Sequence, residues 1–167
     1  MGIFDFLKPQ PYQDPQLGIL QHSKGYWRGL ISLAPHVDAP LLLSGGRAGP
    51  NQAGVVLARG LPDRFPTLIP SIQEALFEHY LPYWEAVEAG EVEGPADPCP
   101  RITEPAGVWE FAVPKRVVIA PLNGVPTIEI AYGVRWDAEH TLAARIQAWK
   151  LIELCGSIRD APRASWR

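Results

Sequence analysis

Apolar residues alternate with polar ones at both ends of the chain, and a helical pattern lies between them. The alternation predicts short strands over residues 17–22, 26–33 and 39–44. In the last third it predicts strands over 116–122, 125–136, 142–147 and 151–158. From Ile128 to Trp136, apolar side chains alternate with polar or small ones, which indicates a strand with one covered face.

The middle of the chain carries the helical pattern. Between residues 65 and 87, apolar residues recur at steps of three and four. Ser71 and Glu74 suit a capping box, so we expect a helix to begin at Ile72, and Pro82 should split or kink it. Asn51 and Gly60 predict the two ends of a further short helix, and Gly90 predicts the end of the helical region.

These elements predict an α+β fold. We expect an antiparallel sheet of about seven strands, three before and four after two or three helices, with the helices packed on one face. Asn123-Gly124 predicts a tight hairpin, because a type I′ turn needs positive φ at both central residues. The predicted organisation is an N-terminal turn and linker over 1–16, a single domain over 17–158 and a basic tail over 159–167.

The net charge of −3 conceals a strong local excess of acid. Residues 74–110 hold nine acidic residues and one basic residue, Arg101. This excess disfavours nucleic-acid binding and favours a basic protein partner. The expected interaction residues are Glu85, Glu88, Glu91 and Glu93. The alternative is a solvated helix face followed by an acidic loop.

Other sequence features narrow the class of protein. No stretch of about 18 apolar residues occurs, so we expect no membrane span. The first residues lack the pattern of a secretory signal, and Cys99 and Cys155 form neither a zinc nor a redox motif. We therefore expect a cytoplasmic protein with free thiols and no cofactor.

Candidate chemistry is concentrated in the run Trp136-Asp137-Ala138-Glu139-His140. Trp136 continues an apolar strand face and is expected in the core, and Asp137 suits an Asx-turn. Glu139 and His140 have two interpretations. A carboxylate beside an imidazole suits general acid–base catalysis, and it equally suits a salt-bridged turn.

A metal site has weak support from the sequence. His36 and Asp38 have a spacing that suits chelation, and His140 is the third candidate ligand. Nothing in the sequence places the first two residues near His140. His79 falls on the apolar stripe of the main helix, where a core histidine with a satisfied hydrogen bond is the expected role.

The C-terminal half resembles a set of small bacterial domains of unknown function. The resemblance rests on the Asn123-Gly124 hairpin, the Trp136-to-His140 run and a last hairpin, and it covers residues 108–158. Some of these domains look like immunity or accessory proteins of bacterial toxin systems. The resemblance implies a bacterial cytoplasmic context and assigns no reaction.

Two functions from different classes follow. The preferred one is a non-enzymatic interaction protein, of immunity type, that uses the acidic segment as its binding surface. The alternative is a small hydrolase or metal-dependent enzyme that uses His140 with Glu139 and Asp137.

Overall fold

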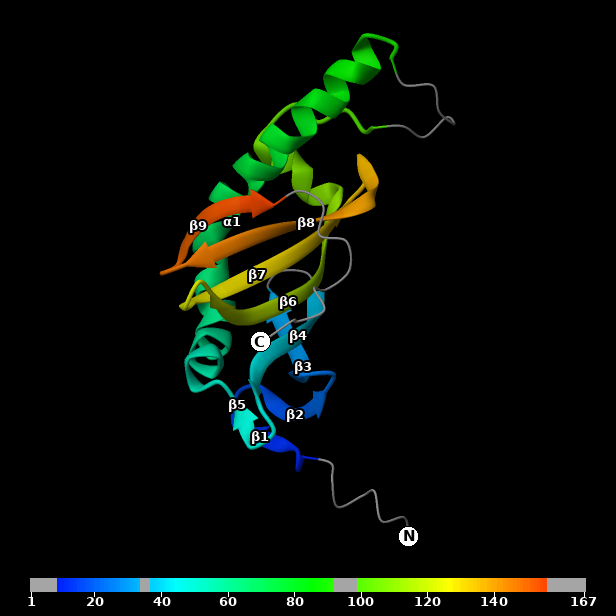
Figure 1. The fold of residues 1–167 in the computed structure, drawn as a ribbon. Helices are drawn as coiled ribbons and strands as arrows, with labels where there is room; N and C mark the ends of the chain where they lie inside the picture. Colours follow the sequence, from blue (N-terminus) through cyan, green and yellow to red (C-terminus); the bar gives the residue numbers. More distant parts are fainter. Residues whose placement is uncertain (1–8, 34–36, 92–98, 156–167) are drawn as a thin grey trace.

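The computed structural model describes residues 9–33, 37–91 and 99–155. Within them a nine-stranded mixed sheet is crossed on one face by a long helix (Figure 1). The elements are, in chain order, β1 (Tyr12–Asp14), β2 (Gly18–Ser23), β3 (Tyr26–Leu33), β4 (Val37–Gly46), β5 (Gly49–Pro50), α1 (Gln52–Glu88), the 3₁₀ helix η2 (Pro105–Glu110), β6 (Ala112–Leu122), β7 (Val125–Val134), β8 (Asp137–Gln147) and β9 (Lys150–Cys155).

The sheet consists of two antiparallel halves joined by one parallel pair. Its order is β1-β2-β3-β4-β6-β7-β8-β9, and β5 pairs with β4. Strands β4 and β6 run parallel, with Leu41 opposite Val117 and Leu43 opposite Ile119. The chain crosses from one to the other through α1, which covers the inner face of the sheet (Figure 1).

The predicted α+β class is therefore wrong: the described residues form a mainly β molecule with a mixed sheet, one long helix and one 3₁₀ helix. Strands β1 and β5 have three and two residues, too few to show an alternating pattern. The parallel pair joins strands that are distant in the chain, and no turn motif marks such a pairing.

The predicted series of short helices is also wrong. Helix α1 runs unbroken for 37 residues, about 55 Å, through Gly60 and four prolines. It begins as predicted, because the side chain of Asn51 accepts hydrogen bonds from the amides of Ala53 (3.0 Å) and Gly54 (3.3 Å). It ends before Gly90, which takes the expected positive φ of 69°.

Burial explains why α1 continues past its prolines. Its inner stripe is buried against the sheet and consists of Gly54, Val55, Ala58, Leu61, Phe65, Leu68, Ile72, Leu76 and Tyr80. Each large apolar side chain contributes about 1.5–3 kcal/mol on burial, so the stripe offsets a cost of about 3 kcal/mol at each proline. Pro66, Pro70 and Pro82 are solvent-exposed, so water can satisfy the carbonyls that they leave without a helical donor.

Gly60 lies inside the helix because the β8–β9 turn packs on it. A Cβ at Gly60 would lie 3.3 Å from the ring of Trp149. Both residues of that turn, Ala148 and Trp149, have positive φ (47° and 60°), an unfavourable conformation for residues with a side chain. The guanidinium of Arg64 lies 4.8 Å from the Trp149 ring centroid, so packing and a cation–π contact compensate the strained turn.

The Asn123-Gly124 hairpin is confirmed. It joins β6 to β7, and its two central residues have φ of 53° and 80°.

Strand β1 lies within the segment predicted as a linker and is tied to α1 by an ion pair. The buried carboxylate of Asp14 accepts two hydrogen bonds from Arg59, at 2.6 Å and 3.1 Å to Oδ2. The hydrogen bond from Arg59 lowers the pKa of Asp14 to about 2.

Candidate functional site

The Trp136-to-His140 run lies where α1 passes the turn between β7 and β8. Here the helix contributes His79 and Tyr83, the turn contributes Trp136, and β8 contributes Asp137 and His140. These five residues are called the junction cluster. Trp136 is 6 % exposed, which confirms the predicted core position, and its ring packs edge-on against Tyr80 with centroids 5.6 Å apart.

Three hydrogen bonds connect the junction cluster. The indole Nε1 of Trp136 donates to Nδ1 of His79 (3.1 Å). The hydroxyl of Tyr83 donates to Oδ2 of Asp137 (2.8 Å). Oδ1 of Asp137 lies 2.8 Å from Nδ1 of His140. Both carboxylate oxygens of Asp137 therefore have a partner, one on α1 and one on β8. This is a larger role than the predicted Asx-turn.

The surroundings of the cluster set the charge of its members. Burial alone would raise the pKa of Asp137, but the hydrogen bonds from Tyr83 and His140 outweigh it and lower the pKa. Burial, together with the hydrogen bond to Asp137, raises the pKa of Tyr83 to about 12. Burial lowers the pKa of His79. At neutral pH the cluster therefore holds one carboxylate, a neutral phenol and a neutral His79.

The carboxylate that pairs with His140 is Asp137, whereas Glu139 is solvent-exposed and lies outside the cluster. An aspartate bound to Nδ1 fixes the orientation of an imidazole, which is one requirement of general acid–base catalysis. The imidazole side chain of His140 is 32 % exposed and accessible from solvent. The two sequence candidates Asp137 and His140 are thus brought together.

The predicted metal ligands are not brought together within the described residues. No group of three His, Cys, Asp or Glu side chains there could hold a metal ion. Asp38 accepts a hydrogen bond from the hydroxyl of Ser32 (2.7 Å) at the start of β4. Strands β6 and β7 separate β4 from β8, so Asp38 and His140 lie at least about 14 Å apart across the sheet. His36 lies outside the described residues.

The acidic residues near the end of α1 are solvent-exposed. The helix continues past the edge of the sheet at β9 (Figure 1). Glu85, Glu88 and Glu91 are all exposed there, whereas Glu93 lies outside the described residues. The last turn of α1 carries no basic residue. This projecting end, residues 85–91, is called the acidic arm.

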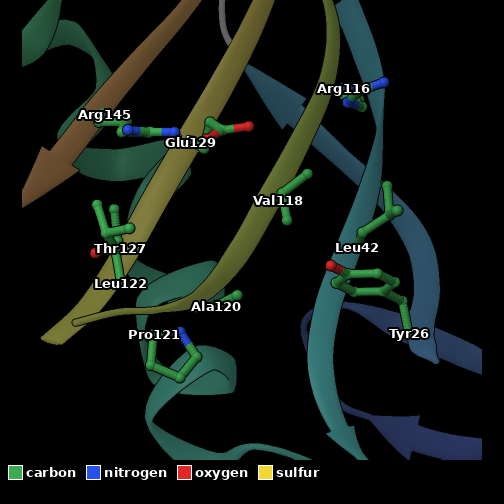
Figure 2. Close-up of a pocket in the computed structure, with 10 residues that line it drawn as sticks. All are labelled: Tyr26, Leu42, Arg116, Val118, Ala120, Pro121, Leu122, Thr127, Glu129 and Arg145. Atoms are coloured by element: carbon green, nitrogen blue, oxygen red, sulfur yellow. Dashed lines mark hydrogen bonds and ion pairs between the residues drawn. The ribbon is translucent and has the colours of Figure 1, made fainter. Parts of the chain in front are cut away.

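A groove on the outer face of the sheet, opposite α1, was not predicted from the sequence. Figure 2 shows Tyr26 and Leu42 on one side of it, Thr127 and Arg145 on the other, and Val118 between them. The cavity volume is about 220 Å³. This outer groove is lined by Tyr26, Leu42, Arg116, Val118, Ala120, Pro121, Leu122, Thr127, Glu129 and Arg145.

One sequence signal for the outer groove exists. Val117, Val118 and Ile119 form a continuous apolar run, so apolar side chains must point to both faces of β6. The groove also requires Leu42 of β4 to lie beside Val118, and that neighbourhood depends on the parallel pairing.

A family model for a domain of unknown function, DUF6985, matches residues 58–161. The chain belongs to this family. No curated protein and no solved structure matches the chain. None of the described helices is long and apolar enough to cross a membrane.

The DUF6985 match covers some of the features described above and leaves out others. It contains the whole junction cluster, the acidic arm and the four strands β6–β9. It begins inside α1 and leaves out β1–β5. The outer groove spans this boundary, since Tyr26 and Leu42 precede the match and its other lining residues fall within it.

Proposed function

We propose that this DUF6985 protein is a bacterial cytoplasmic interaction module, non-enzymatic and of immunity type, that binds a basic protein partner through its acidic arm. The observation that carries the proposal is the exposed acid of the arm. Within the described residues, no ion pair involves Glu85, Glu88 or Glu91. Their charges are therefore available to a partner.

The position of these acids argues against a purely structural role. The C-terminal end of a helix carries a partial negative charge, so acidic side chains there destabilise the helix, typically by about 0.3–1 kcal/mol each. Helix α1 has no basic residue in its last turn to offset this cost. A basic partner would neutralise both the side chains and the helix end.

The junction cluster holds the base of the acidic arm in a fixed position. Tyr83 is bonded to Asp137 and His79 to Trp136, so the helix is fixed to the sheet immediately before the arm begins. A surface that is already ordered loses less conformational entropy on binding than a flexible one does.

The test is capture of a partner from the native host, followed by affinity measurements at 50 and 300 mM salt. The triple variant Glu85→Gln, Glu88→Gln, Glu91→Gln should weaken binding about tenfold at low salt, and added salt should weaken the unmodified protein most. Glu93→Gln should add to the loss.

A matched control is Asp63→Asn, which removes an exposed acid from the same helix but away from the arm. Its affinity should stay within about twofold of the unmodified protein. The proposal fails if no partner is captured, or if the partner binds the triple variant as tightly as it binds the control.

A second candidate function is favoured by the Asp137–His140 pair. A small hydrolase would use His140 as a general base that Asp137 orients, with the exposed Glu139 beside His140 in the chain. Hydrolysis of p-nitrophenyl esters and phosphoesters should then be measurable and should fall at least 100-fold in His140→Ala. Equal rates in the two proteins would exclude this function.

A further inference from the structure

The outer groove contains a half-buried arginine, Arg116, with one polar atom that the described residues leave without a hydrogen bond. Nε of Arg116 is buried from solvent and has no hydrogen-bond partner within the described residues. Removing an N–H donor from water without supplying an acceptor is costly. An anionic ligand bound to the accessible part of the guanidinium would supply the acceptors that the described residues do not.

The other charged residues of the groove are already paired. Arg145 binds Oε2 of Glu129 through Nε (3.1 Å) and Oε1 of Glu153 through Nη1 (2.8 Å). These three side chains form a ladder across β7, β8 and β9. Arg116 is thus the cation of the groove that remains open to a ligand.

The remaining lining forms an apolar track that leads away from Arg116. Val118, Ala120 and Leu122 follow Arg116 at alternate positions of β6, so these four residues extend for about 20 Å along the strand. Leu42 flanks the track on the β4 side (Figure 2). Arg116 lies at one end and Leu122 towards the other, which suits an elongated ligand with its charge at one end.

We propose that the outer groove binds a linear aliphatic monocarboxylate, with the carboxylate on Arg116 and the hydrocarbon chain along Val118 and Ala120. Guanidinium groups bind carboxylates through a planar pair of N–H donors, and the two terminal nitrogens of Arg116 form such a pair. The volume of about 220 Å³ lies below the usual range for drug-sized ligands, so the chain is of medium length. This site lies on the sheet and is independent of the acidic arm.

The probes are octanoate, octylamine and 1-octanol, titrated into the full chain by calorimetry and by amide chemical shifts. Octanoate should bind at one site with a Kd below about 1 mM and shift the amides of β6. Octanol should bind at least tenfold more weakly, and octylamine should not bind. Failure of octanoate to bind, or equal binding of octylamine, would overturn the proposal.

Two variants separate the charge from the apolar track. Arg116→Gln should weaken octanoate at least tenfold and leave octanol unchanged. Ala120→Leu keeps Arg116 but narrows the track, and it should weaken both ligands. Arg28→Gln is the matched control, because Arg28 lies on β3 beside the groove without lining it, and it should bind octanoate normally. Equal octanoate affinity in Arg116→Gln and Arg28→Gln would also overturn the proposal.

Discussion

Trp136 and Asp137 are neighbours in the chain, and each connects the sheet to α1 by a different interaction. The indole of Trp136 is buried and packs against Tyr80, whereas the carboxylate of Asp137 binds Tyr83 and His140. The strand alternation was enough to predict the burial of Trp136. It could not predict Tyr83 as a partner of Asp137, because that contact depends on how α1 crosses the sheet.

Because Trp136 is buried and His140 is partly exposed, we expect mutations at the two positions to affect stability unequally. Trp136→Ala should lower the free energy of unfolding by about 3–5 kcal/mol, because it leaves a cavity under α1. His140→Ala should cost about 1 kcal/mol, since it removes one partner of Asp137 from a partly exposed position. Urea denaturation of both variants measures the difference. Equal losses would show that the imidazole, too, is a core element.

His79 predicts a pH dependence of stability. Burial lowers its pKa below the ordinary value of 6.5, and its Nδ1 must be unprotonated to accept from Trp136. The unfolded chain therefore binds more protons than the folded one as the pH falls through 6.5, and the stability falls with it. The nearby Asp137 limits the loss, and the nearby His140 adds to it.

The measurement is the melting temperature of the protein between pH 8 and pH 5. His79→Asn should show a weaker decrease in this window, because the amide oxygen can still accept from Trp136 but does not titrate. Parallel curves for the two proteins would contradict the role of His79.

At the scale of the elements, the sequence was sufficient to predict features that depend on adjacent residues, but not features that depend on contacts between distant parts of the chain. The hairpin at Asn123-Gly124 and the cap at Asn51 were predictable, because each depends on a few adjacent residues. The continuity of α1 was not, because burial of a stripe against a sheet overrides the local effect of proline. The outer groove also escaped prediction, since β3, β4, β6, β7 and β8 build it together.

Pro70 tests this interpretation of α1. Pro70→Ala should raise the free energy of unfolding by about 2 kcal/mol, the helix-propensity gain of about 3 reduced by the greater freedom of the unfolded chain. Glu74→Ala, an exposed position one turn later, is the control and should change stability by less than about 0.5 kcal/mol. A destabilised Pro70→Ala protein would mean that a proline bend is needed to seat the stripe.

At the scale of the whole molecule, the sheet is continuous across the start of the DUF6985 match. Strand β6 pairs with β4 on one side and with β7 on the other. Trp27, Leu41 and Leu43 precede the match and belong to the same core as Ile119 and Tyr132. We therefore expect the molecule to behave as one cooperative unit.

The fragment 51–167 tests whether the whole molecule folds as one cooperative unit. It contains the whole match but lacks β1–β5, so it would expose the edge of β6 and part of the α1 stripe. Unprotected strand edges promote association, so the fragment should aggregate or lack a cooperative thermal transition. Size-exclusion chromatography and circular dichroism measure both. A monomeric fragment with a sharp transition would show that the matched region folds alone.

The parallel pairing of β4 with β6 also has a consequence for the route by which the chain folds. Each antiparallel half of the sheet forms between strands that follow one another, which requires only short loops to close. The pairing of Leu41 with Val117 closes a far longer loop, with the whole of α1 inside it. The β4–β6 pairing should therefore form late. In the transition state for folding, the two antiparallel halves of the sheet should already be formed but not yet paired with each other.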